Sequence, residues 1–295
     1  MPDDHALLPG RGLAASRALR QAVVFQGVGL HTGAAATLRI SPSDEAGIVF
    51  SREDCAGSVV PARVEFSAGS ARRAALASGG VRIESVEHVL AALHGAGIWR
   101  ARLALDGPEV PALDGSAAPF YQALLAASEP GGAPPAALEV RRLARAVEGR
   151  SAAVLLPAAS TRVSARVDLR GRAFRVRDFA PERFADVAWA RTFVYAEEVA
   201  GLWRQGLARG GSLDNAVVFG ATDPLNVGGL RADDEPARHK VLDALGDLAL
   251  LGAPLRGHLV LVRPSHRLTV ALLRDALRSG AIGQFRPSPA RPSLA

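Results

Sequence analysis

The chain has 295 residues, of which 48% are hydrophobic and only 5% aromatic, and its formal net charge is +6. This length is enough for a well-buried core in one large domain or two domains of average size. No apolar run approaches the ~20 residues that a membrane-spanning helix needs. The N-terminal MPDDHALLPGRG lacks the apolar region of a signal peptide, so we expect a cytoplasmic protein. Cys55 is the only cysteine, which excludes an intrachain disulfide and any zinc site built from several cysteines.

Alternating apolar residues and turn signals in the first half predict strands that are interrupted by two helices. The first helix begins at Glu84 or Ser85, runs through VEHVLAALHGAG and stops at glycine. The Gly- and Pro-rich stretch 128–138 has no periodicity and marks a domain boundary, which defines an N-terminal domain over 15–129. The predicted strands of this domain lie at 20–25, 36–40, 47–50 and 100–105, and its second helix at 117–127.

The second half opens with alternating strands and then mixes helices and strands. Segregated helices beside strands that look antiparallel predict an α+β protein, in which each half is a sheet with helices on one face. The C-terminal domain spans 138–282, and we expect the Pro-rich residues 283–295 to form a flexible tail. The predicted strands are 137–143, 151–157, 161–169, 173–179, 191–195, 215–219 and 257–262. The predicted helices are 181–187, 196–204, 234–251 and 266–278.

The most informative predicted helix reads DEPARHKVLDALGDLALLG. His239, Asp243 and Asp247 follow one another at intervals of four residues and therefore share one face, whereas the opposite face is apolar. An ionised carboxylate on a largely buried helix needs a cation or several hydrogen bonds. A histidine and an aspartate one turn apart can both reach one divalent ion, so the pattern indicates a metal site with Asp247 beside it. The alternative is a solvated polar turn at the start of the helix.

A second candidate segment is ESVEHVLAALHGAG, in which Glu87 and His88 are adjacent. It lacks the HExxH spacing that supplies two zinc ligands from one helix. It can supply one histidine ligand and one carboxylate base, which would complete a site of two histidines and one aspartate with His239 and Asp243. His94 lies six residues after His88, away from its helical face, and we interpret it as structural.

Two further residues are candidates for proton transfer and substrate contact. His266 in RPSHRL stands where a strand ends and a helix begins, a position at which functional groups collect. It is a candidate general acid that protonates a departing amine, and Asp247 is the anion that would raise its pKa. Lys240 is the only lysine among 35 basic residues, which indicates a position where a compact ammonium group is required.

The arginines spread along 141–150 and 162–177 make a nucleic-acid-binding protein the alternative from another functional class. Such a surface would need aromatic side chains beside the arginines for base stacking, and this region offers only Phe174 and Phe179. It also gives no reason for a helix face of one histidine and two aspartates. We therefore expect no nucleic-acid partner.

Several segments, taken together, carry a family resemblance: GVGLHTG, SVEHVLAAL, LDGPEVPALDGSAAPF, ARTF, GGSLDNAVVF, LN-x-GGLR, DEPARHKVLDALGDL and the final histidine of RPSH. In this order, from about residue 20 to about residue 280, they closely resemble the zinc-dependent UDP-3-O-acyl-N-acetylglucosamine deacetylases of lipid A biosynthesis. The resemblance implies an amide hydrolase that removes acetate from a UDP-linked acylated amino sugar. It also implies two similar two-layer domains packed face to face, with the active site between them.

The resemblance implies a role for each catalytic candidate. His88, His239 and Asp243 match the family's zinc ligands. Glu87 matches its general base, and His266 matches its general acid. The implied cofactor is Zn²⁺, with Fe²⁺ as the alternative metal in the cell. A homologue that has lost its catalytic activity is the alternative to an active deacetylase.

Other matches concern the substrate. Thr192 matches a residue that contacts the oxyanion, and Asp247 a carboxylate near the acidic histidine. Lys240 and Phe193 match residues that contact the substrate. An insert near 196–215 would form an apolar tunnel for the 3-O-acyl chain. The implied protein is a cytoplasmic monomer, whose contact with the inner membrane is peripheral and is made through the acyl chain of the substrate.

The chain departs from the family pattern in three places. Pro264 and Ser265 precede the catalytic histidine where a glycine is usual. Val194 follows RTF where a small residue is usual, and Leu156 stands where a lysine is expected. These positions bear on acyl-chain length and nucleotide contacts, and they leave the metal ligands and the base unchanged.

Overall fold

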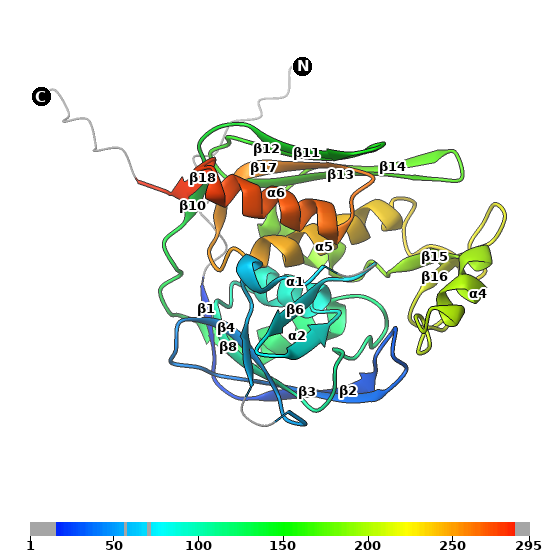
Figure 1. Ribbon diagram of the computed structural model, residues 1–295, viewed down its shortest axis with the longest axis horizontal. Coiled ribbons are helices and arrows are strands. Elements are labelled where there is room, and N and C mark those ends of the chain that lie inside the picture. Colours follow the sequence, from blue (N-terminus) through cyan, green and yellow to red (C-terminus); the bar gives the residue numbers. More distant parts are fainter. Residues whose placement is uncertain (1–15, 56–57, 70–71, 287–295) are drawn as a thin grey trace, which may run out of the picture.

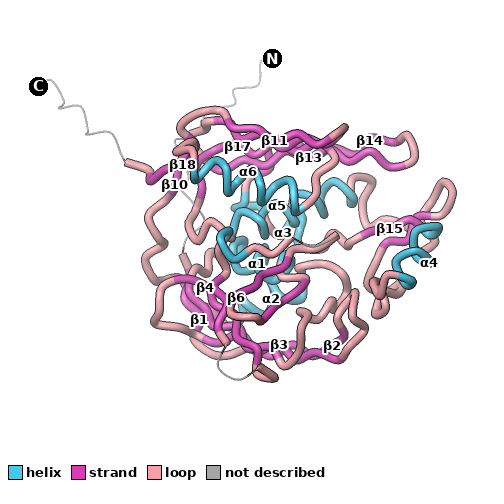
Figure 2. The backbone as a smooth tube through the Cα atoms, viewed as in Figure 1, coloured by secondary structure: helices cyan, strands magenta, loops and turns pink. Residues whose placement is uncertain are grey.

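The computed structural model describes residues 16–55, 58–69 and 72–286. In this part of the chain two large sheets form the outer layers and helices fill the space between them, so the layers follow the order β/α/α/β (Figure 1). Figure 2 shows the helices enclosed between the two groups of strands. The α+β class predicted from the sequence is confirmed.

The first sheet has five strands within the described residues, in the order β2-β3-β8-β4-β5. β4 and β8 run parallel, and the other neighbours run antiparallel. Leu38 and Ile40 of β3 are fully buried, because alternate side chains of a strand point to the same face. Helices α1 (Glu87–Gly95) and α2 (Ala118–Ala126) lie above this sheet (Figure 1). The strand bounds are Val23–Val28 (β2), Ala35–Ser41 (β3), Gly47–Arg52 (β4), Val59–Pro61 (β5) and Arg100–Leu105 (β8).

The second sheet has seven strands in the described part of the chain. β17 (Leu255–Val262) lies inside it, antiparallel to β12 (Ser151–Leu156) and parallel to β13 (Thr161–Leu169). Helices α5 (Glu235–Ala249) and α6 (His266–Arg278) pack against its inner face. The remaining strands are β10 (Leu138–Val140), β11 (Ala144–Glu148), β14 (Arg172–Phe179) and β18 (Ile282–Gln284).

A lobe, which we define as residues 193–219, projects from one side of the body (right in Figure 1). It contains the parallel pair β15 (Phe193–Tyr195) and β16 (Val217–Phe219), together with helix α4 (Ala196–Arg204). The smaller elements elsewhere are β1 (Arg17–Leu19) paired with β9 (Ser128–Pro130), β6 (Ala75–Ser78) paired with β7 (Val81–Glu84), and the short helices η1 (Val64–Phe66), η2 (Pro181–Arg183) and α3 (Ala185–Ala188).

Helices α1 and α5 join the two halves at the centre of the molecule. A Cβ atom on Gly246 would lie 2.2 Å from the carbonyl oxygen of Glu87, so glycine is required for α5 to approach the first turn of α1 this closely. Buried side chains of both halves, such as Leu90 and Leu245, belong to one continuous core cluster. The close approach places the start of α1 beside the middle of α5.

The long elements agree with the sequence predictions, and the short ones do not. The helix predicted over 234–251 spans Glu235–Ala249, and the one predicted over 266–278 spans His266–Arg278. Short strands such as β5, β6 and β7 are missing from the predictions, because a few residues carry too little periodicity. The strand predicted over 137–143 is shorter, and β11 follows it separately. Among the described residues, no helix has the length and apolar character needed to cross a bilayer.

The structure bears on both ends of the predicted C-terminal domain. β9 lies in the stretch predicted as a boundary and pairs with β1 near the N-terminus. β18 covers the first two residues of the predicted tail and pairs with β10. Residues 287–295 of that tail lie outside the described residues. The domain limits therefore stay predictions.

Candidate metal centre and active site

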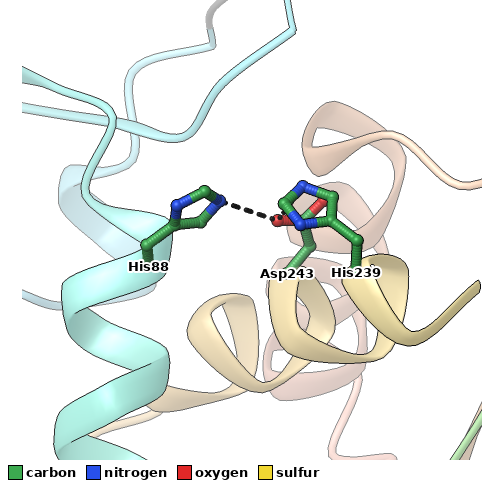
Figure 3. A group of neighbouring side chains, drawn as sticks. All are labelled: His88, His239 and Asp243. Carbon is green, nitrogen blue, oxygen red and sulfur yellow. Dashed lines mark ion pairs between the residues drawn. The ribbon is translucent and has the colours of Figure 1, made fainter. Parts of the chain in front are cut away.

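Three side chains from two helices converge at the contact between α1 and α5. His88 comes from the first turn of α1, and His239 and Asp243 come from successive turns of α5 (Figure 3). One ligand atom from each lies within 4.8 Å of the others. Asp243 Oδ1 is 3.6 Å from His88 Nε2 and 3.4 Å from His239 Nε2. This spacing allows a single cation to contact all three groups.

The chemistry of these groups fits a divalent metal. Asp243 Oδ1 is buried and has no hydrogen-bond partner among the described residues, whereas its other oxygen, Oδ2, accepts from Lys240 Nζ at 2.7 Å. A buried acceptor without a partner is rare in native proteins. Two imidazoles and a carboxylate are ordinary zinc ligands. A cation among His88, His239 and Asp243 would give Asp243 Oδ1 the partner it lacks.

The surroundings of His239 hold it in the form that binds metal. Its Nδ1 lies 3.1 Å from the carbonyl oxygen of Ala190, to which a protonated Nδ1 donates, and this leaves Nε2 directed at Asp243. Burial lowers the pKa of His239 to about 3, so the ring is neutral at physiological pH. Burial acts to raise the pKa of Asp243, but neighbouring charges, among them the ammonium group of Lys240, hold it well below its usual value. Both groups are therefore in their metal-binding states.

Glu87 and His266 lie beside the three candidate ligands. His266 Nε2 is 3.6 Å from Glu87 Oε1, and its Nδ1 forms a 2.9 Å hydrogen bond with Asp247 Oδ1. Burial alone would lower the pKa of His266, but the carboxylates of Asp247 and Glu87 raise it to about 10. Burial raises the pKa of Glu87, which makes its carboxylate a stronger base. The pair therefore offers one proton acceptor and one proton donor on the same side of the ligand set.

The residue before His266 caps the helix that carries it. Ser265 is the N-cap of α6, and its hydroxyl accepts a hydrogen bond from the amide of Leu268 at 3.3 Å. Such a cap satisfies one of the free amides at a helix start. Serine at this position therefore fixes the beginning of the helix that carries His266.

The remaining predicted site residues lie in the same region. A cavity of about 470 Å³ is lined by Thr192, Phe193 and Lys240 as well as by the three candidate ligands, Glu87 and His266. Lys240 Nζ is 5.4 Å from the centre of the Phe193 ring. Asp247 lies behind His266, away from this cavity. The structure thus brings all nine predicted residues together, whereas His94 is buried elsewhere against Trp99, in agreement with a structural role.

The comparisons with known proteins agree with this geometry. Residues 16–278 match the model of the family described as LpxC, UDP-3-O-acyl N-acetylglycosamine deacetylase. The chain belongs to this family. A protein of Myxococcus xanthus (strain DK1622) is 40% identical over 284 residues, which cover 93% of this chain and 90% of the relative. One of Anaeromyxobacter dehalogenans (strain 2CP-C) is 42% identical, with 90% and 88% covered. Both relatives are named UDP-3-O-acyl-N-acetylglucosamine deacetylase.

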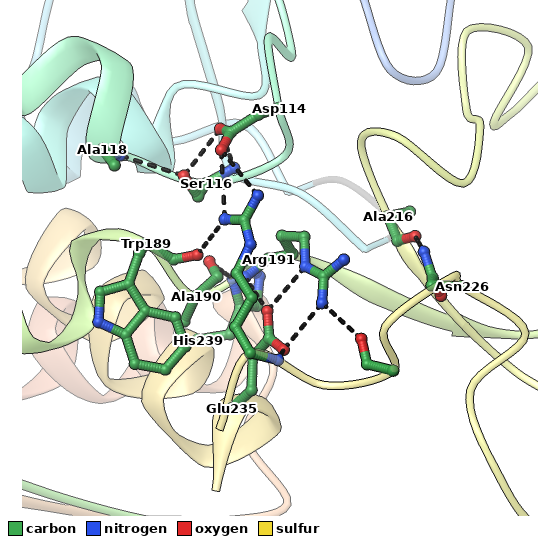
Figure 4. A network of polar contacts seen from close by, with 12 residues as sticks. Asp114, Ser116, Ala118, Trp189, Ala190, Arg191, Ala216, Asn226, Glu235 and His239 are labelled. Atoms are coloured by element: carbon green, nitrogen blue, oxygen red, sulfur yellow. Dashed lines mark hydrogen bonds and ion pairs between the residues drawn. The ribbon is translucent and has the colours of Figure 1, made fainter. Parts of the chain in front are cut away.

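In this LpxC-family chain, a buried ion pair positions the segment next to the candidate metal centre, and the sequence patterns did not predict it. The Glu235 carboxylate accepts from the backbone amide of Arg191 and from its guanidinium at 2.9 and 3.0 Å (Figure 4). The Arg191 guanidinium also donates to the carbonyl of Gly229. Because Ala190 and Thr192 flank this arginine, the pair holds both the Nδ1 partner of His239 and a cavity-lining threonine. The ARTF motif contained the arginine, but nothing local identified its partner.

A second contact, made to Asp114 and Trp189 (both labelled in Figure 4), ties the same segment to the first half. The Arg231 guanidinium bonds Asp114 Oδ2 at 3.2 Å and the carbonyl of Trp189 at 2.6 Å. The other oxygen of Asp114 accepts from the amide and hydroxyl of Ser116. The loop DGPEVPALDGS therefore supports the wall of the site from outside.

Replacing Glu235 with alanine is expected to lower the free energy of unfolding by about 3–5 kcal/mol, because Arg191 would stay buried without its carboxylate. Asp234→Ala is the matched control. This replacement removes the neighbouring ion pair between Asp234 and Arg238, whose side chains are 33% and 28% exposed, respectively. It should lower the free energy of unfolding by less than about 1 kcal/mol. Chemical denaturation measures both values. Equal effects of the two replacements would contradict a structural role for the buried pair.

Proposed function

We propose that this chain is a metal-dependent amidase that removes the acetyl group from UDP-3-O-acyl-N-acetylglucosamine, a step of lipid A biosynthesis. The observation that carries the proposal is the ligand set of His88, His239 and Asp243 beside the buried pair Glu87 and His266. Membership of a family named for this activity supports it. Zinc is the proposed metal and Fe²⁺ the alternative in the cell, because imidazole and carboxylate ligands suit both.

The proposed reaction divides proton transfer between two residues. A metal ion held by the three ligands would acidify a bound water and polarise the acetamide carbonyl. Glu87 accepts the proton of the attacking water, and the Thr192 hydroxyl lies in the cavity wall where it can donate to the oxyanion that develops. His266 donates its Nε2 proton to the sugar nitrogen as the bond to the acetyl carbon breaks. Asp247 accepts from Nδ1 and keeps the ring protonated and oriented.

Lys240 and Phe193 are proposed to contact the sugar. The ammonium group lies at the cavity edge, held by Asp243 at 2.7 Å, and the aromatic ring packs near His239, with the ring centres 6.0 Å apart. A compact ammonium group with three donors suits a place between the carboxylate and the ring. This agrees with the presence of a single lysine in the chain.

An arginine-rich cavity near the site suits the diphosphate of the proposed substrate. It measures about 400 Å³ and is lined by Arg150, Arg166, Arg170 and Arg263, together with Tyr195, two small residues and Asp168, which pairs with Arg166 and Arg263. Arg263 is three residues before His266 in the chain. Guanidinium groups bind phosphate oxygens through paired hydrogen bonds. We propose that the nucleotide end of the substrate lies here.

The lobe supplies an apolar end of the larger cavity, which suits an acyl chain. Val199, Leu202, Trp203 and Leu213 line it from the lobe, and Leu30 lines it from the first half. We propose that this end holds the 3-O-acyl group, so the acyl-binding insert near 196–215 corresponds to the lobe. On this proposal the protein works as a cytoplasmic monomer and meets the inner membrane only through the acyl chain of its substrate.

The test of the proposed function is removal and return of the metal. Treatment with a chelator is expected to abolish acetate release, and one equivalent of zinc is expected to restore it. Metal analysis of protein purified without added metal distinguishes zinc from iron. Full activity in protein shown to be free of metal would contradict the proposal.

A further inference from the structure

Two loops from opposite halves meet at the apolar end of the cavity. The amides of three consecutive lobe residues, Ala208, Arg209 and Gly210, donate to His31 Nδ1 (3.3 Å), to the carbonyl of His31 (3.1 Å) and to the carbonyl of Leu30 (3.0 Å), respectively. Burial lowers the pKa of His31, so its Nδ1 is free to accept. The turn between β2 and β3 therefore holds the lobe backbone in place through these three hydrogen bonds.

Glycines make this approach possible. A Cβ atom on Gly210 would lie 2.3 Å from the carbonyl oxygen of Gly29. Gly33 has a φ of +67°, and a Cβ atom there would lie 3.0 Å from the side chain of Arg209. Backbone-to-backbone contact of this kind excludes any side chain. The glycines of GVGLHTG thus serve the contact with the lobe.

A single buried carboxylate fixes the shape of the β2–β3 turn. Glu109 is 1% exposed and lies in the segment between β8 and α2. It accepts from the amides of His31 (3.0 Å) and Thr32 (2.8 Å), from the Thr32 hydroxyl (2.8 Å) and from the Ser85 hydroxyl (2.6 Å). The His31 amide lies within 3.2 Å of both carboxylate oxygens, so an ionised carboxylate satisfies it, whereas the NH2 group of a glutamine would face a donor in either orientation.

The contact forms part of the cavity wall. Leu30 and His31 on one side and Ala208 and Gly211 on the other all line the 470 Å³ cavity. Glu109 itself touches neither the cavity nor the candidate metal ligands. Its influence passes through the turn that it holds and through Ser85, whose hydroxyl it binds and which lines the cavity.

We propose that Glu109 is a positioning residue that closes the acyl end of the cavity, because it holds the turn on which the lobe docks. The inference rests on the proposed function in one respect, namely that the apolar end accepts an acyl chain. It means that Glu109, a carboxylate in the first half of the protein, helps to select the length of the substrate's acyl group. A loosened lobe would bind a long acyl chain less well and would leave the reacting groups in place.

The kinetic test compares a long-chain with a short-chain substrate. Glu109→Gln should raise the KM for the long-chain substrate on the order of tenfold or more, change its kcat by less than about threefold, and leave the short-chain kcat/KM nearly unchanged. The metal content should stay the same. Equal losses on both substrates, or a loss confined to kcat, would overturn the proposal.

The structural test needs no substrate. Hydrogen exchange of the amides of residues 208–210 should accelerate in Glu109→Gln, while exchange along α5 stays slow. Gly210→Ala disrupts the same contact from the side of the lobe and leaves Glu109 intact. It should accelerate hydrogen exchange of the same amides, so the test stays decisive if Glu109→Gln fails to fold. Gly201→Ala in α4 is the control, because a Cβ atom there meets nothing within 4 Å.

Unchanged exchange at 208–210 in both variants would overturn the proposal. The exchange result also separates this inference from the proposed function. If the enzyme acted on a different substrate, Glu109→Gln and Gly210→Ala would still accelerate these amides, and the docking role would stand on its own.

Discussion

Replacing Glu87 with alanine is expected to leave the metal in place and to lower kcat by about 10²–10⁴-fold, the usual contribution of a general base. The reason is geometric. Glu87 lies beside the ligand set, its Oε2 accepts from the amide of Ala74 at 3.1 Å, and its Oε1 is 3.6 Å from His266. It is not one of the three grouped ligand residues. Metal analysis and acetate release, measured on the same preparation, test both halves of the expectation.

Two comparison variants sharpen this result. Glu87→Gln keeps an acceptor for the Ala74 amide and removes only the basicity, so it should be about as slow as the alanine variant. His239→Ala removes a proposed ligand and should lose the metal itself. Loss of metal from Glu87→Ala would mean that Glu87 is a ligand, and the division of roles proposed here would be wrong.

The second large effect concerns pH. On the proposed mechanism Glu87 acts deprotonated and His266 protonated, so the dependence of the rate on pH is expected to be bell-shaped. The acid limb reports Glu87 together with the metal-bound water as a coupled system. The carboxylates around His266 raise its pKa to about 10 in the metal-free protein, and a dication nearby would lower it. Activity therefore falls as the pH rises through the pKa of His266, which defines the basic limb.

His266→Gln should flatten or move the basic limb and lower kcat by about 10²–10⁴-fold, with little change in metal content. Asp247→Asn removes the anion that favours the imidazolium, so the basic limb should shift to lower pH. Asp275→Asn on the same helix is the control, because its side chain is 65% exposed. An unchanged basic limb in His266→Gln would mean that another group delivers the proton.

The sequence could predict those parts of the site whose residues lie close together in the chain, and not those whose residues lie far apart. His239, Asp243 and Asp247 share a face of α5 because of a four-residue spacing, which is a local property that periodicity detects. His88 reaches the same point from a helix roughly 150 residues earlier. No local pattern encodes that approach: the sequence offered His88 only as a candidate to complete the ligand set, and the family resemblance supported the choice.

The buried carboxylates Glu235 and Glu109 could not be recognised from the sequence. Glu235 reads as an ordinary acidic residue in the first turn of a helix, where it would favour the helix dipole. In the fold it is fully buried and binds Arg191. Glu109 reads as one of three carboxylates in a loop, yet it is buried among four donors. Which partner a buried charge finds is decided by tertiary packing.

The placement of the proposed ligand set across α1 and α5 has a consequence for biosynthesis. His88 leaves the ribosome early, whereas Asp243 follows it by roughly 150 residues, which takes on the order of ten seconds at ordinary rates of synthesis. The first sheet and its helices can fold during that interval with only one ligand in place. Metal acquisition must therefore wait until α5 has emerged and packed against α1, so the nascent chain passes most of its synthesis unable to hold the ion that its activity is proposed to need.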